Sequence, residues 1–105
     1  MAWAYVGVAG LLEVVWAWFM KASNGFSKPA DTALCIVTMI ASFWLLSLAM
    51  KTLPLGTAYA VWTGIGALGA FLAGMVMLGE PANGLRLGSA ALIFLGLIGL
   101  RLAER

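Results

Sequence analysis

Four long apolar stretches dominate this chain, and they limit it to a membrane protein built of helices. They run approximately over residues 2–20, 32–50, 57–78 and 87–100, and charged residues separate them. About 20 helical residues cross a hydrocarbon core of ~30 Å, so the first three stretches are long enough. The fourth is long enough if Arg86 and Arg101 extend their side chains to the two interfaces. Because the stretches are continuous rather than alternating, helices are favoured over a closed barrel.

The composition excludes several other classes of protein. Apolar residues make up 64% of the 105 positions and charged residues 10%, whereas soluble domains average about 25% charged. A soluble globule of this size could not bury so much apolar surface, which excludes a soluble enzyme and a nucleic-acid binder. We therefore expect one all-α transmembrane domain over residues 1–105. It would be a multi-pass protein of the cell (inner) membrane and not an enzyme.

Histidine is absent and Cys35 is the only cysteine. A His/Cys metal site and an intrachain disulfide are therefore excluded, and no cofactor is expected. Cys35 lies in an apolar stretch, so we expect a small buried side chain there. The first stretch lacks a basic leader and contains Glu13, so we do not expect it to be a signal peptide.

The positive charges at the ends of the stretches favour neither side of the membrane. One set of ends carries Lys51, Arg101 and Arg105, and the other carries Lys21, Lys28 and Arg86. Because Lys and Arg normally mark the cytoplasmic side, this balance predicts insertion in both orientations. A single topology decided by one weak signal is the alternative. Four helices are too few to enclose a polar path, so we expect an antiparallel homodimer with a two-fold axis in the membrane plane.

Glu13 is the only charged residue inside an apolar stretch. It follows Trp3 by ten residues, which places it about 15 Å deep in a helix and near the membrane midplane. An ionised carboxylate at that depth costs at least ~3 kcal/mol, and no Lys or Arg lies at matching depth. The alternative to a functional role is a protonated side chain that is hydrogen-bonded between helices. We expect Glu13 to be a proton or cation site.

Helical spacing identifies candidate neighbours of Glu13. Gly10 lies one turn before it and Trp16 one turn after it, on the same face. Tyr59 and Trp62 are three residues apart and share a face of the third stretch, and both have polar ends that need a partner when buried. Packing alone would also explain several of these residues.

Polar and small residues of the second and fourth stretches complete the set of candidates. Ser42 is a polar residue in the middle of the second stretch, where bonding to its own helix backbone is the simplest explanation. The fourth stretch contains no candidate side chain for binding a proton or a cation. Its small residues predict a helix-packing seam between subunits, formed by Gly88, Ala91, Gly96 and Gly99.

Two Glu13 side chains would approach each other in a two-fold dimer. Such a pair holds protons when empty or a cation when deprotonated, which is the minimum for proton/cation exchange. Trp faces attract cations, and a carboxylate pair matches the two-pronged geometry of a guanidinium group. Because Trp16 also fills space beside Glu13, a small planar cation is favoured over a bulky one.

Four blocks of the sequence resemble the small multidrug resistance family, and specifically its guanidinium-exporter branch. They are residues 13–17 (EVVWA) with Lys21, 23–26 (SNGF), 41–46 (ASFWLL) and 51–66 (KTLPLGTAYAVWTGIG). The last block is long and specific, and the resemblance covers nearly the whole chain. It implies an antiparallel homodimer of four-helix subunits that exports guanidinium-type cations in exchange for protons by alternating access.

The resemblance also implies roles for individual residues. Glu13 would bind both the proton and the substrate, and Trp16, Ser42 and Trp62 would hydrogen-bond and orient it. Tyr59 would lie beside the carboxylates and gate the path, and Gly10 would leave room on the Glu13 face. The fourth stretch would supply the dimer contact. The multidrug branch carries a small residue where Trp16 stands, which implies a narrower substrate class here.

Other functions remain open. A proton-coupled exporter of quaternary ammonium compounds and other drugs is the first alternative. A small dual-topology ion channel ranks lower, because a buried anionic pair repels anions. A rotor subunit with one buried carboxylate and a purely structural membrane subunit rank lowest.

Overall fold

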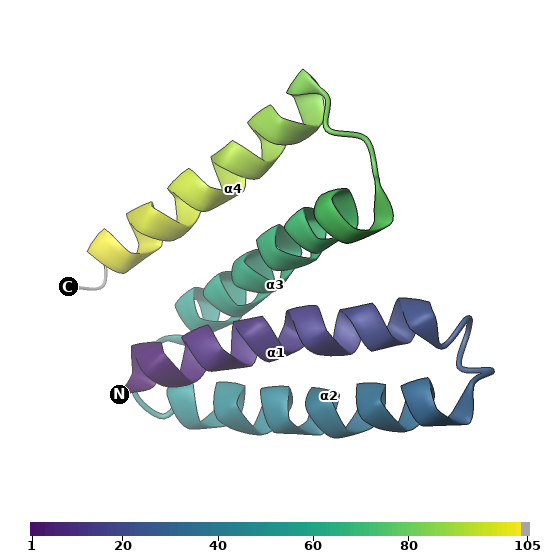
Figure 1. The fold of residues 1–105 in the computed structure, drawn as a ribbon. Coiled ribbons are helices and arrows are strands. Elements are labelled where there is room, and N and C mark those ends of the chain that lie inside the picture. Colours follow the sequence, from purple (N-terminus) through teal and green to yellow (C-terminus); the bar gives the residue numbers. More distant parts are fainter. Residues whose placement is uncertain (104–105) are drawn as a thin grey trace.

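The computed structural model describes residues 1–103, which form four helices (Figure 1). These are α1 (Ala2–Ala22), α2 (Pro29–Ala49), α3 (Leu55–Leu78) and α4 (Gly84–Ala103). Each is long and apolar enough to cross a membrane. The expected all-α membrane class with four transmembrane helices is therefore confirmed, and the chain is a multi-pass membrane protein. Arg105, which was counted at one end of the spans, lies outside the described residues.

The connections are short because local signals end one helix and start the next. Pro29 occupies the first turn of α2, where its missing N–H costs nothing, and Asp31 in the same turn complements the helix dipole. Gly79 ends α3 in the left-handed conformation, with φ of 68°. The N–H of the next residue, Glu80, donates to the Gly74 carbonyl oxygen at 3.2 Å, as in common helix C-caps.

Helix α1 lies at the centre of the packing. It runs antiparallel beside α2 and also packs on α3, whereas α4 packs mainly on α3 (Figure 1). The buried apolar core sits where α1, α2 and α3 meet, and it comprises Val6, Ala9, Leu46, Ala49, Ala58, Val61 and Trp62. Cys35 is also fully buried, as expected for a small apolar side chain.

The subunit is flat. Its principal extents are 42 × 35 × 16 Å, so its thinnest dimension is less than two helix diameters of about 10–12 Å each. Helix α4 has no buried residue, and large apolar side chains are exposed on all four helices. A single subunit of this shape cannot surround a polar path, so a path through the membrane needs a second surface.

Candidate functional site

Glu13 lies on the side of α1 that faces α3, and its side chain is half-buried. The α3 backbone approaches it at Gly66, which is buried. A Cβ atom at position 66 would overlap the Glu13 carboxyl group, so the carboxyl occupies the space that any larger residue would fill. Gly66 therefore lets the carboxyl group lie directly against the backbone of a neighbouring helix.

The same contact between α1 and α3 continues on both sides of Glu13. A Cβ atom at Gly10 would lie 2.7 Å from the Cβ of Ile65, and one at Gly69 would overlap the Val14 side chain. Glycines of both helices thus allow a close crossing of α1 and α3 around the carboxyl group. In this subunit, Gly10 makes room for α3 beside Glu13.

A buried chain of hydrogen bonds joins α1, α2 and α3. It reaches α1 at Ala9, one helical turn before Glu13. Trp62 Nε1 donates to Ser42 Oγ at 2.9 Å, and Ser42 Oγ donates to the Ala9 carbonyl oxygen at 2.7 Å. Ser42 is fully buried and Trp62 is 7% exposed. The chain satisfies both polar groups inside the bundle and fixes the orientation of the Trp62 ring.

An aromatic cluster from three helices lies beside this chain of hydrogen bonds. Phe43 of α2 lies edge-on between Trp16 of α1 and Trp62 of α3, with ring centroids 6.3 Å and 5.7 Å away. Tyr59 extends the cluster, with its ring centroid 5.4 Å from that of Trp62. Phe43 and Tyr59 are exposed on the subunit surface. Aromatic faces grouped in this way attract organic cations.

Trp16 carries an unused hydrogen-bond donor. Its Nε1 atom is buried and has no hydrogen-bond partner within residues 1–103. Trp16 follows Glu13 by three residues, so the two side chains leave the same face of α1. A buried N–H without a partner is costly, and an acceptor from a ligand or a second subunit would relieve that cost.

The structure brings some of the predicted residues together. Ser42 and Trp62 are bonded to each other, and Trp16, Trp62 and Tyr59 belong to one aromatic cluster. Within residues 1–103 none of them hydrogen-bonds to Glu13; Ser42 and Trp62 use their donors on Ala9 and on each other. Their roles in orienting Glu13 and lining a binding site therefore stay a prediction.

The predicted seam on α4 is open in the single subunit. A Cβ atom at Gly88, Gly96 or Gly99 would meet no atom within 4 Å, and Ala91 is exposed. These small residues have no packing role within residues 1–103, and a role between subunits stays a prediction.

Sequence reasoning did not assign Phe43, Gly66 or Gly69 to the site. Phe43 could have been found from its position beside Ser42. The contact between Gly66 and the Glu13 carboxyl had no sequence signal, because the distance between two helices does not follow from the periodicity of either. Within the described part of the chain, no three His, Cys, Asp or Glu residues are grouped to hold a metal ion.

Comparisons of the sequence with known proteins show which family the chain belongs to. The sequence matches the family described as Small Multidrug Resistance protein over residues 1–98. The guanidinium exporter of Escherichia coli (strain K12) is 56% identical over 103 residues, which cover 98% of each protein. The guanidinium exporter of Yersinia pestis is 54% identical over 104 residues, covering 99% of this chain and all of the relative. That of Salmonella typhi is 53% identical over 103 residues. The chain therefore belongs to the small multidrug resistance family.

Proposed function

We propose that this protein is a proton-coupled antiporter that exports guanidinium and small substituted guanidinium cations by alternating access. One observation carries the proposal: the lone intramembrane carboxyl group of Glu13 lies on the same helix face as the unpartnered indole N–H of Trp16, which belongs to an aromatic cluster from three helices. The names and high identity of the relatives support guanidinium as the cation.

Exchange follows from the chemistry of one carboxyl group. A protonated Glu13 is neutral and tolerated in the membrane, whereas an ionised Glu13 needs a cation beside it. Proton and substrate therefore bind in turn and not together. If the site opens to one side of the membrane at a time, a proton taken up from one side is exchanged for a cation released to that same side.

Guanidinium suits this site by shape as well as by charge. It is planar, it donates several N–H groups in one plane, and it stacks on aromatic rings. The ring of Trp16 contacts Phe43 and occupies space next to Glu13, which leaves less room for a bulky cation. Small substituents on guanidinium would extend toward the exposed Phe43 and Tyr59.

We further propose that the working unit is an antiparallel homodimer. The flat subunit cannot enclose a path, and α4 offers a row of small residues that pack against nothing within residues 1–103. The balanced positive charges at the two ends of the spans support insertion in both orientations. A two-fold axis in the membrane plane would bring two Glu13 residues to a common depth.

Uptake of radiolabelled guanidinium by purified protein in liposomes tests the function. With a pH gradient imposed, the wild-type protein is expected to accumulate guanidinium against its own gradient. Glu13→Gln should abolish accumulation, because an amide cannot release a proton. Glu80→Gln is the matched control: this carboxylate is paired with Arg86 in the connection before α4, so its removal should leave transport intact. Accumulation by Glu13→Gln, or accumulation that ignores the pH gradient, would overturn the proposal.

A quaternary ammonium exporter is the second candidate, since an aromatic cluster also suits quaternary ammonium cations. The same liposomes distinguish the two by competition between guanidinium and a bulky quaternary ammonium cation. Transport of the bulky cation without guanidinium transport would favour this alternative. Conductive flux without proton coupling would instead favour a channel.

A further inference from the structure

The connection between α1 and α2 is organised around one buried serine. Ser23 is fully buried, and its Oγ donates to the Met20 carbonyl oxygen at 2.7 Å and accepts from the Phe26 N–H at 3.0 Å. The carbonyl oxygen of Ser23 accepts from the backbone N–H groups of Ser27 and Lys28, at 2.9 Å and 3.1 Å. Residues 23–28 therefore form a compact, internally bonded turn.

This turn adopts a backbone conformation that is unfavourable for most residues. Asn24, Gly25 and Phe26 have consecutive φ values of 50°, 73° and 65°. Left-handed non-glycine residues cost about 1 kcal/mol or more each, and such strain persists where the surroundings require it. The result of the turn is that Lys28, seven residues after Lys21 in the sequence, returns to the end of α1.

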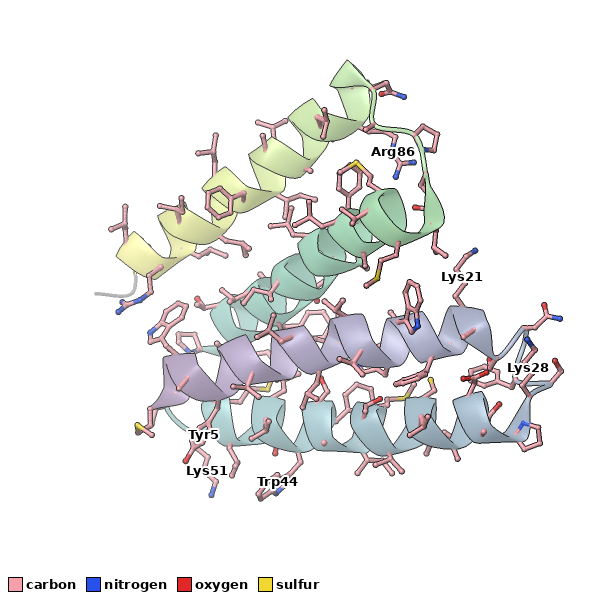
Figure 2. The ribbon with its side chains drawn as sticks, viewed as in Figure 1. Tyr5, Lys21, Lys28, Trp44, Lys51 and Arg86 are labelled. Atoms are coloured by element: carbon pink, nitrogen blue, oxygen red, sulfur yellow. The ribbon has the colours of Figure 1, made fainter. Side chains whose placement is uncertain are left out.

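A pocket of about 300 Å³ lies between this turn and the end of α3. We call it the loop pocket, and it is lined by Trp18, Lys21, Ala22, Asn24, Lys28 and Leu78. Figure 2 shows Lys21 and Lys28 at the same end of the molecule, where α1 ends and α2 begins. Two cationic side chains, one amide and two apolar walls thus meet at a single site.

The positive charge of the loop pocket has no acidic partner within residues 1–103. The ion pair in this part of the chain joins Arg86 to Glu80 at 3.7 Å, and it involves neither lysine. Glu80 borders the neighbouring pocket together with Lys21, but it does not line the loop pocket. Asp31 lies in the first turn of α2 and is not a lining residue either. The two lysines of the loop pocket therefore carry positive charge that no acidic side chain of residues 1–103 neutralises.

The position of the loop pocket selects the kind of anion. Lys21 is in the last turn of a membrane-crossing helix, so the pocket lies at the depth of lipid headgroups. Trp18 and Leu78 supply apolar lining to the pocket, and Trp is enriched at the membrane interface. A phosphate diester with acyl chains would contact both the lysines and the apolar lining of the loop pocket, whereas a free phosphate would contact only the lysines.

We propose that the loop pocket binds the phosphate group of an anionic phospholipid. Lys21 and Lys28 contact the phosphate oxygens, Asn24 donates its amide N–H to the headgroup, and the acyl chains leave past Trp18 and Leu78. The proposal does not depend on the transport function. In an antiparallel dimer, each leaflet would hold one such lipid.

Native mass spectrometry of the detergent-purified full-length chain tests the proposal. This measurement does not depend on the orientation in which the protein inserts into a membrane. Phosphatidylglycerol and phosphatidylcholine are added at equal concentration, and the bound copies of each are counted. The wild-type protein is expected to prefer phosphatidylglycerol. Lys21→Gln and Lys28→Gln should each reduce its binding by about fivefold, the usual effect of one basic residue near a membrane surface. Lys51→Gln, at the opposite end of the molecule, is the matched control and should bind like the wild type (Figure 2).

Further arms make the result decisive. Lys21→Arg and Lys28→Arg keep the charge and should retain the preference for phosphatidylglycerol. Inorganic phosphate should displace the lipid only at much higher concentration than a competing anionic lipid. The proposal is overturned if both Gln variants bind phosphatidylglycerol like the wild type, or if Lys51→Gln loses as much binding. Displacement by inorganic phosphate at equal concentration would also overturn it.

Discussion

At the scale of single residues, the Glu13 carboxyl and the Gly66 backbone occupy adjoining space between α1 and α3. The carboxyl group is thereby held on one side by backbone that cannot move away without separating the two helices. The hydrogen-bond chain from Trp62 through Ser42 to Ala9 fixes the neighbouring turn. Position and orientation of the site therefore depend on residues that carry no charge.

Gly66→Ala should impair transport more than stability. The added methyl group overlaps the Glu13 carboxyl and displaces it, and misplacing a reacting group by about 1 Å can cost up to about 100-fold in rate. We expect guanidinium transport to fall by about tenfold or more. Gly56→Ala, on the same helix with open space around it, is the control and should transport normally. Equal transport by both variants would show that Gly66 does not position the carboxyl group.

Ser42→Ala should destabilise the folded subunit by about 1 kcal/mol or more. The substitution leaves Trp62 Nε1 buried without an acceptor and removes the donor to the Ala9 carbonyl. Ser47→Ala is the control, because Ser47 Oγ bonds only within α2, to the Trp44 carbonyl, and is exposed. Denaturant unfolding in detergent measures both, and equal stability of the two variants would contradict the role of the chain.

Glu13 could be identified from the sequence, whereas several of its contacts could not. A charge inside an apolar stretch stands out because lipid penalises it, and that argument needs no structure. The neighbours on α1 follow from helical spacing. Gly66 contributes from α3, and its proximity to Glu13 depends on how closely glycines let α1 and α3 cross. No periodicity within one helix encodes that distance.

At the scale of helices, α4 differs from the other three. Helices α1 to α3 share the buried core, whereas α4 rests on α3 and buries no residue. An arginine near each end of α4 contacts an aromatic ring of another helix. Arg86 lies over the Phe71 ring at 4.9 Å and Arg101 over the Trp3 ring at 4.8 Å. This helix is fixed at the two interfaces and leaves its middle available to a partner.

Gly96→Leu should weaken the dimer without unfolding the subunit. The position is open in the single chain, and Leu is a better helix former than Gly. Filling a closely packed interface costs about 1–3 kcal/mol, which raises the dimer dissociation constant by about tenfold or more. Light scattering in detergent measures the oligomeric state, with Gly56→Leu as the control at another open position. An unchanged dimer would place the subunit contact elsewhere.

The number and type of helices could be predicted from the apolar stretches, because lipid admits few alternatives. Their ends differ from those of the stretches. Helix α4 runs over Gly84–Ala103 and takes in Arg86 and Arg101, whose side chains lie over aromatic rings. Hydropathy alone could not place these two arginines within the helix. A hydropathy scale penalises the charge of arginine and takes no account of its contact with an aromatic ring.

At the scale of the whole molecule, the balance of positive charge between the two ends and the flat shape of the subunit both support the proposed antiparallel dimer. Lys21, Lys28 and Arg86 lie at one end and Lys51 at the other (Figure 2), the end where Arg101 of α4 lies over Trp3 near the start of α1. Neither end is strongly basic, which supports the proposed insertion in both orientations and the proposed antiparallel dimer. In that proposed dimer, the second subunit would supply the wall that a single subunit 16 Å thick lacks.

Added lysines should make activity depend on a partner of opposite orientation. Ala30→Lys with Ala82→Lys biases one end of the chain toward the cytoplasm, and Thr52→Lys with Leu55→Lys biases the other. Each double variant alone should lose guanidinium transport in cells, and co-expression of the two should restore it. Full transport by either variant alone would exclude the antiparallel arrangement.

Proton release on guanidinium binding tests most directly that one carboxyl group serves both ligands. Guanidinium is titrated into purified protein in weak buffer across a range of pH, and the released protons are counted. We predict release of up to one proton per Glu13 from the wild-type protein, declining at high pH as the carboxyl group is already ionised, and none from Glu13→Gln. Guanidinium binding without proton release at any pH, or equal release from Glu13→Gln, would contradict the account.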